Sequence, residues 1–194
     1  MALAAVRAAA APDVAEIVRI QAGTWAAAYA QLVPPAAIEQ LAGPAAREAW
    51  TAAVGAGDGH HVLVATEGEW TVGFCAAAVA TAPEGAVVSA PEGAVVSDEP
   101  ELGPGAWGEI GVLLVEPRWG RRGHGGRLLG AAATALREAG SLYGLAWIPE
   151  ADEASRRFYA RAGWEPDGAT RAFDTGEGVL REVRLTGSLD LKLV

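Results

Sequence analysis

The chain of 194 residues contains very little of three residue types, and each shortage excludes something. Cys75 is the only cysteine, so the chain can form no internal disulfide and carries no Cys/His cluster with the spacing of a zinc site. Its setting, FCAAAVA, predicts a buried structural thiol. Lys192 is the only lysine and asparagine does not occur, a bias typical of bacterial genomes rich in G and C. In such a chain an aspartate can stand where related proteins use an asparagine.

A long hydrophobic run is also lacking, although half of the residues are hydrophobic. No apolar stretch approaches the roughly 18 residues that cross a bilayer. Arg7 and Asp13 interrupt the Ala-rich start, where a signal peptide would be uniformly apolar. The net charge of −9 argues against general binding of nucleic acid, because a phosphate backbone needs a basic face. We expect a soluble, cytoplasmic protein whose electrostatic field favours a cationic partner.

Hydrophobic spacing and turn residues predict helices and strands in a mixed order. The helical patterns lie at 12–32, in an interrupted region at 36–57, at 125–140 and at 152–163. The strand patterns lie at 60–68, 70–81, 107–115, 143–148, 169–174 and 179–186. This order is typical of an α/β (α+β) fold. We expect one domain over 1–194, with a mixed central sheet of about six to seven strands flanked by about four helices.

An acidic insertion rich in Pro and Gly occupies about 82–106 and contains a repeat. The eight residues APEGAVVS at 82–89 occur again without change at 90–97. Two copies of this length are too few for a repeat architecture. A tandem duplication in a tolerant surface loop is the favoured interpretation, and a lid over an acceptor pocket is the alternative.

A glycine-rich turn, VEPRWGRRGHGG at 115–126, joins a strand pattern directly to a helical pattern. Backbone N–H groups at a helix start have no partner within the helix, and the helix dipole adds partial positive charge, so anions bind there. Arg121 and Arg122 add full charges and several donors, which favours a diphosphate over a carboxylate. The Rossmann pattern fails because Leu128 occupies its third glycine position, and no Gly-Lys-Ser/Thr follows for a Walker loop.

This turn and three other stretches together resemble the GNAT superfamily of N-acetyltransferases, in particular its bacterial small-molecule members. The family's acetyl-CoA signature is Gln or Arg, two residues, Gly, any residue, then Gly or Ala. The chain has GRRGHG at 120–125, so Gly120 replaces the leading residue and Arg121 supplies a charge from the next position. The other stretches are the apolar triplet at 113–115, DEASRRFYARAGW at 152–164, and TWAAAY with LVPP at 24–35.

The resemblance implies an acyltransferase that moves an acetyl group from acetyl-CoA to a primary amine of a small molecule or protein by direct attack, without a metal. Strand alternation would place Glu109, as the base, on one face with Leu113 and Val115. Tyr159 would be the acid toward the departing thiolate. Their alternative roles are a solvated glutamate at a strand end and core packing beside Phe158. The cofactor-binding residues that the resemblance implies are Leu113, Leu114, Val115, Arg121, Arg122, Gly123, His124, Gly125, Gly126, Arg127 and Asp152.

For four of the residues linked to the site, the sequence leaves the role open. His124 lies where the family accepts almost any residue, so packing or solvent contact would explain it equally. Asp152 replaces the family's asparagine and can accept hydrogen bonds but not donate them as an amide does. Trp25 and Tyr29 lie four residues apart on a predicted helix, where core packing is the default. In this family they would instead form an aromatic wall of the acceptor site.

Two other functions stay open from the sequence. A catalytically silent acyl-CoA-binding module would bind acetyl-CoA without turnover, and a nucleotide-binding protein would be competed by ATP and indifferent to coenzyme A. The net negative charge fits a polyamine, an aminoglycoside or a basic peptide equally well as the acceptor. Exposed strands in the final hairpin would allow two subunits to pair as a homodimer.

Overall fold

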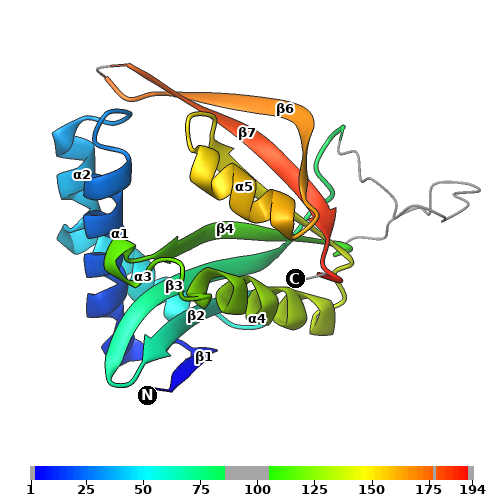
Figure 1. Ribbon diagram of the computed structural model, residues 1–194, viewed down its shortest axis with the longest axis horizontal. Coiled ribbons are helices and arrows are strands. Elements are labelled where there is room, and N and C mark those ends of the chain that lie inside the picture. Colours follow the sequence, from blue (N-terminus) through cyan, green and yellow to red (C-terminus); the bar gives the residue numbers. More distant parts are fainter. Residues whose placement is uncertain (1–2, 86–104, 177, 192–194) are drawn as a thin grey trace, which may run out of the picture.

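One seven-stranded sheet organises the residues that the computed structural model describes, which are 3–85, 105–176 and 178–191. Its strand order is β1-β2-β3-β4-β5-β7-β6 (Figure 1). The strands are β1 (Ala4–Ala8), β2 (His60–Glu67), β3 (Trp70–Ala80), β4 (Trp107–Val115), β5 (Tyr143–Pro149), β6 (Glu165–Asp174) and β7 (Val179–Ser188). Neighbouring strands are antiparallel except β4 and β5, which are parallel. The predicted mixed sheet is therefore confirmed.

The edge strand β1 is an element that the sequence did not predict. Its residues are mostly alanine, which has little intrinsic preference for strands. It forms because it pairs with β2, from Ala4 opposite Glu67 to Ala8 opposite Leu63. Contact with a distant segment, rather than local preference, makes this segment a strand.

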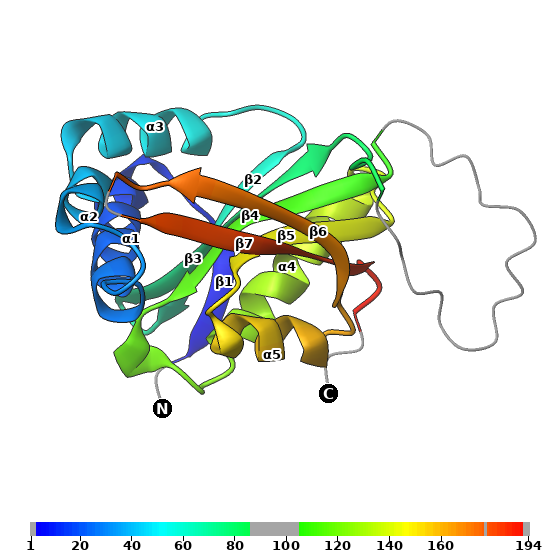
Figure 2. The same cartoon turned by 90° about the horizontal axis from the view of Figure 1, so that it is seen from above.

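Helices cover both faces of the sheet (Figures 1 and 2). They are α1 (Val14–Ala28), α2 (Pro35–Leu41), α3 (Pro44–Val54), α4 (His124–Glu138) and α5 (Glu153–Arg161). On one face, Ile17 of α1 packs in a cluster with Phe74 of β3 and Trp50 of α3. On the other face, Leu128 of α4 belongs to a larger cluster that includes Tyr159 of α5. The two clusters are the two halves of the core.

The interrupted helical region predicted at 36–57 consists of two separate helices. Gly43 and Pro44 divide it, with Gly43 in an extended conformation as the N-cap of α3. The described residues therefore contain five α-helices where about four were expected. Most of the duplicated segment lies at 86–104, outside the described residues, so its role as a surface loop or a lid stays a prediction.

The parallel pair β4 and β5 opens along its length. The two strands are in register only from Trp107 opposite Tyr143 to Glu109 opposite Leu145. Beyond that point β4 keeps β3 as its partner, and β5 keeps β7. The sheet is thus split between its two central strands, toward their carboxyl ends. The β6–β7 hairpin reaches toward α1 and α2 on the side of the sheet where the two strands separate (Figure 2).

Close packing fixes the end of the sheet opposite this opening. Trp164 is 1% exposed, and an added Cβ on Gly144 or Gly187 would lie 2.3 Å from its ring. These two strand positions therefore accept only glycine.

Cys75 is buried in the same core cluster, and burial raises the pKa of its thiol to about 12. The predicted buried structural thiol is confirmed.

Candidate active site

A cavity of about 730 Å³ is lined by both strands where β4 and β5 separate. Its volume is in the range of sites for small molecules and cofactors. The wall is built from the end of α1, the second half of β4, the glycine-rich turn, the end of β5, α5 and β7. The lining residues that bear on function are Thr24, Trp25, Tyr29, Leu113, Leu114, Val115, Trp119, Arg121, Gly123, His124, Gly125, Gly126, Trp147, Asp152, Phe158, Tyr159, Arg161 and Glu182.

The glycine-rich turn ends in the first residues of α4, at one end of the cavity. Gly123 is the N-cap in the left-handed conformation, with φ 80°, and the N–H of Arg127 makes the first bond of the helix to its carbonyl. The N–H groups of His124, Gly125 and Gly126 precede that bond and so have no acceptor within the helix. These residues line the cavity, and the binding of an anion by their N–H groups stays a prediction.

Three arginines near the start of α4 are placed differently. Arg121 lines the cavity and has φ 61°, a left-handed conformation in which a side chain is strained. The Arg122 guanidinium lies 3.1 Å from Oε1 of Glu67 and 4.8 Å above the Trp119 ring. Arg127, in α4, donates to the carbonyl of Arg122 at 2.9 Å. Arg121 therefore lines the cavity, while Arg122 and Arg127 hold the turn together.

His124 is buried and bonded rather than open to solvent. Its Nε2 lies 2.8 Å from Oε2 of Glu67, at the end of β2. That hydrogen bond, with the charge of Arg122, lowers the pKa of Glu67. The side chain of His124 thus ties the start of α4 to the sheet, and its backbone N–H is the part directed to the anion site.

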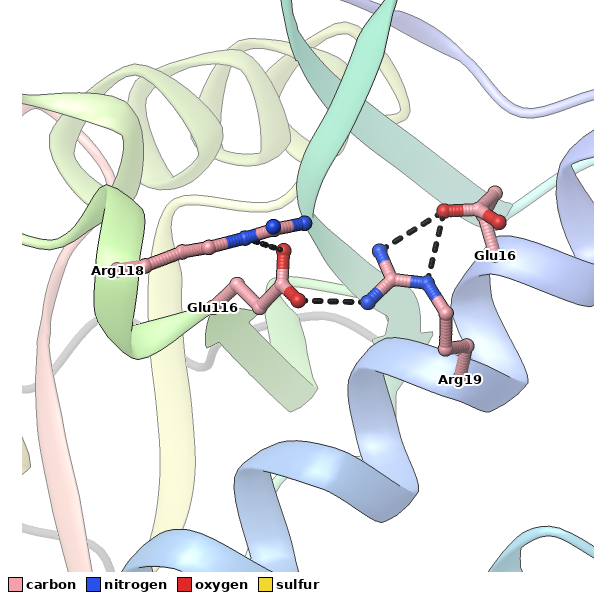
Figure 3. A network of polar contacts seen from close by, with 4 residues as sticks. All are labelled: Glu16, Arg19, Glu116 and Arg118. Atoms are coloured by element: carbon pink, nitrogen blue, oxygen red, sulfur yellow. Dashed lines mark hydrogen bonds and ion pairs between the residues drawn. The ribbon is translucent and has the colours of Figure 1, made fainter.

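A second polar network fixes the other end of the turn to α1 (Figure 3). The Glu116 carboxylate, directly after β4, binds Arg19 at 2.6 Å and Arg118 at 3.1 Å. Arg19 also binds Glu16 at 2.8 Å. Burial by itself would raise the pKa of Glu116, but the bonds and charges of the two arginines outweigh it and lower that pKa. The network holds the strand end, the turn and α1 in one arrangement.

The predicted apolar triplet, Leu113, Leu114 and Val115, lines the cavity. Among the described residues, β4 is in register with β5 only as far as Glu109. The backbone groups of the triplet that face β5 therefore have no partner on that strand. They are suitably placed to bind the amide groups of an extended ligand arm.

A bulge in β4 changes which side chains share a face. Gly111 has no counterpart in the register with β3, so Ile110, Leu113 and Val115 all pack toward α4 although Ile110 and Leu113 are three positions apart. Glu109, next to Ile110, lies on the opposite face. The prediction that Glu109 shares a face with Leu113 and Val115 is wrong for this reason. Glu109 is half-buried and is not one of the residues that line the cavity.

Tyr159 reaches the cavity from within the core. Its side chain is 2% exposed, and burial raises the pKa of its hydroxyl well above the usual value, with Cys75 and Tyr29 adding to the effect. The phenol is therefore protonated at neutral pH. Its ring lies 5.1 Å from Phe158 and 5.2 Å from Trp164. One residue thus packs in the core and also presents a proton donor to the cavity.

Asp152 and Tyr29 meet at the other end of the cavity. Asp152 is the N-cap of α5 and accepts from the N–H of Ser155 at 2.9 Å and from its hydroxyl at 2.7 Å. The Tyr29 hydroxyl donates to the same carboxylate at 2.5 Å. Burial, followed by that bond, raises the pKa of Tyr29. The Trp25 ring lies 5.0 Å from that of Tyr29 and both line the cavity, while their contact with an acceptor stays a prediction.

Sequence reasoning missed other residues of the cavity. Thr24 Oγ1 and Trp119 Nε1 are buried without a hydrogen-bond partner among the described residues. Trp147 and Glu182 come from β5 and β7, and no short motif connects them. Thr24 had a local signal, because it is next to Trp25. Trp119 lies within the glycine-rich turn itself, whereas Trp147 and Glu182 are brought to the cavity by strand pairing, which a single sequence does not specify.

Solved structures of acetyltransferases share this fold. PaiA N-acetyltransferase of Thermoplasma acidophilum, in complex with coenzyme A, has a TM-score of 0.71 at 13% identity, over 96% of this chain and 99% of that one. YncA of Salmonella typhimurium, with its cofactor acetyl-CoA, has a TM-score of 0.60 at 19% sequence identity, over 96% of this chain and 94% of that one. The ribosomal-protein-S18-alanine N-acetyltransferase of Escherichia coli has a TM-score of 0.63 at 12% sequence identity, over 97% of this chain and 96% of that one. Among curated protein sequences, none matches the chain.

A family model decides the class. The model described as the acetyltransferase (GNAT) family matches residues 25–164, more than half of the chain. The chain therefore belongs to the acetyltransferase (GNAT) family and is an acyltransferase, as its sequence predicted. In the described part of the chain, no helix is both long and apolar enough to span a membrane, and no three His, Cys, Asp or Glu residues gather as metal ligands.

Proposed function

We propose that the chain transfers the acetyl group of acetyl-CoA to a primary amine of a small molecule or protein by direct attack, in the cytoplasm. The single observation that carries the proposal is the cavity itself. It joins the open N-terminus of α4, the unpaired edge of β4 and a protonated buried tyrosine in one continuous space. These are the parts that an acyl-CoA donor and its thiolate leaving group require.

The donor would bind along the glycine-rich turn and β4. Its pyrophosphate would accept hydrogen bonds from the N–H groups at 124–126, with Arg121 adding a charge-assisted contact. Glycine at position 125 also lets the turn pack against α5, because an added Cβ would lie 3.3 Å from the Phe158 ring. The amide groups of the pantetheine arm would pair with the backbone of Leu113, Leu114 and Val115. Asp152, as the N-cap of α5, would contact the arm only through its carboxylate oxygens.

In the reaction, the amine nitrogen forms a bond to the acetyl carbonyl carbon and the carbon–sulfur bond breaks. The sulfur leaves with the electron pair, the Tyr159 hydroxyl donates the proton that makes it a thiol, and the second proton that the acylated nitrogen releases returns Tyr159 to its phenol form. A phenol with a raised pKa remains protonated until the thiolate forms. Glu109 would take the proton of the attacking ammonium through a water molecule, because its side chain does not line the cavity.

The test combines binding with turnover. Calorimetry with acetyl-CoA and with ATP, followed by a thiol-release assay across a panel of amines, should give tight binding of acetyl-CoA, indifference to ATP and release of coenzyme A with at least one amine. Binding without thiol release for every amine would instead establish a catalytically silent module. Binding of ATP in preference to coenzyme A would establish a nucleotide-binding protein. The predicted homodimer is tested in the same preparation by its mass in solution.

A further inference from the structure

The two ends of the cavity carry opposite charge. At one end lie the N-terminus of α4 and Arg121, and Arg161 lines the cavity on the last turn of α5. At the other end lie two carboxylates, Asp152 and Glu182. Phe158 lies six positions after Asp152, about 9 Å along the helix axis, and is close to the phosphate end at Gly125. The end away from the predicted phosphates is therefore suited to a positively charged group.

Glu182 occupies a defined and largely buried place at this end. It lies on β7, opposite Pro149 of β5 and Arg171 of β6, and it is 9% exposed. Its Oε2 accepts from Nε of Arg171 at 2.6 Å, and the guanidinium of Arg171 stacks 4.4 Å above the Trp147 ring. Its charge is close enough to Tyr29 to contribute to the raised pKa of that hydroxyl.

The two carboxylates differ in how their oxygens are used. Both oxygens of Asp152 are bonded, to Ser155 and Tyr29. Glu182 holds Arg171 at Oε2, and a carboxylate has sites for about four donors. Glu182 is therefore the better placed of the two to receive a donor from a ligand. The ring of Trp25, which lines the same cavity, would add cation–π attraction for an ammonium group, whereas the Trp147 ring already carries the guanidinium groups of Arg171 and Arg184, at 4.4 and 5.6 Å.

We propose that the acceptor is a slender organic cation with a second positive group, and that Glu182 binds that second group. The inference rests on the proposed N-acetyltransferase function. The attacking nitrogen must lose its charge before it forms the new bond, so a carboxylate that remains charged pairs best with a cationic group elsewhere in the molecule. A diamine satisfies both requirements, with one nitrogen near Tyr159 and the other at Glu182.

The experiment compares three amines of similar length that differ in the charge of the far end. They are 1,4-diaminobutane, butylamine and 4-aminobutanoate, whose far ends are positive, neutral and negative. The wild-type kcat/KM should fall in that order. Glu182→Gln keeps the shape and still accepts from Arg171, but it should lower the ratio of diaminobutane to aminobutanoate about tenfold or more. The KM for acetyl-CoA should not change.

Arg171→Gln is the matched control, because it breaks the same ion pair and leaves the carboxylate in place. Its diaminobutane to aminobutanoate ratio should equal or exceed that of the wild type. An equal fall of the ratio in both variants would mean that the ion pair only supports the fold, and would overturn the proposal. A ratio that Glu182→Gln leaves unchanged would overturn it as well, while the acetyltransferase function would stand.

A binding measurement separates this inference from catalysis. Calorimetric titration of 1,4-diaminobutane into the enzyme saturated with coenzyme A should detect binding in the wild type and in Arg171→Gln, and about tenfold weaker binding in Glu182→Gln. Equal binding by all three proteins would refute the role of Glu182. Binding that depends on Glu182, in a protein that acetylates no amine, would support the cation site and refute the proposed function.

Discussion

Replacing Arg121 by glycine separates the folding cost of this residue from its contribution to donor binding. Arg121 has φ 61°, and the left-handed conformation costs a residue with a side chain roughly 1–2 kcal/mol. Glycine removes that strain but adds flexibility to the unfolded chain, which costs about 0.4–1 kcal/mol. The net change should lie between about 0 and 1.6 kcal/mol of added stability. In a chain of this size, that raises the Tm by up to about 6 °C.

The same substitution should weaken the binding of acetyl-CoA. A hydrogen bond to a charged group contributes about 1.5–3 kcal/mol, and an exposed guanidinium belongs at the lower end of that range. The Kd should therefore rise about 10- to 30-fold in calorimetry at low salt, and the effect should shrink as salt screens the contact. Arg121→Ala should lose the same affinity without the gain in Tm, because alanine keeps the strain.

Two further variants show whether the charge or its position matters. Arg122→Ala should change the affinity much less, since that guanidinium is bound to Glu67 and stacked on Trp119. Adding Gly120→Arg to the Arg121→Gly variant should recover part of the affinity, because Gly120 has φ −61°, which any residue adopts, and its added Cβ, 3.1 Å from the Pro117 carbonyl oxygen, requires only a small shift of that oxygen. An unchanged Kd for Arg121→Gly at low salt would refute the assignment of Arg121 to the phosphates.

Further outcomes follow from the core and the site. Tyr159→Phe should lower kcat about 100-fold or more with an unchanged Kd for acetyl-CoA, and an unaltered rate would remove the hydroxyl from the mechanism. In chemical denaturation, Gly144→Ala should cost about 3 kcal/mol, because its Cβ would lie 2.3 Å from an indole carbon; Gly126→Ala, with nothing within 4 Å, should not destabilise. Hydrogen bonds from Arg7 lower the pKa of Asp13, so its ionised form stabilises the fold at neutral pH and that contribution is lost as pH falls through the folded-state pKa. Asp13→Asn should therefore flatten the acid side of the Tm profile below about pH 4, and a profile that keeps its slope would contradict this.

The sequence by itself determined the strand–turn–helix arrangement at the glycine-rich turn, the mixed sheet and the family. Each depends on residues close together in the chain, because a strand end, glycines and a helix start leave open N–H groups wherever they occur in that order. Apolar alternation likewise placed strands β2 to β7. For these features the local chemistry is sufficient.

The tertiary structure alone decided which side chains share the cavity. The bulge at Gly111 moved Glu109 to the other face, and pairing of β5, β7 and β6 brought Glu182 to the cavity. Contact with Glu67, 55 residues away, fixes Arg122, which is not among the residues that line the cavity. Register, bulges and ion pairs between distant segments depend on how the whole sheet packs, and local preference does not encode them.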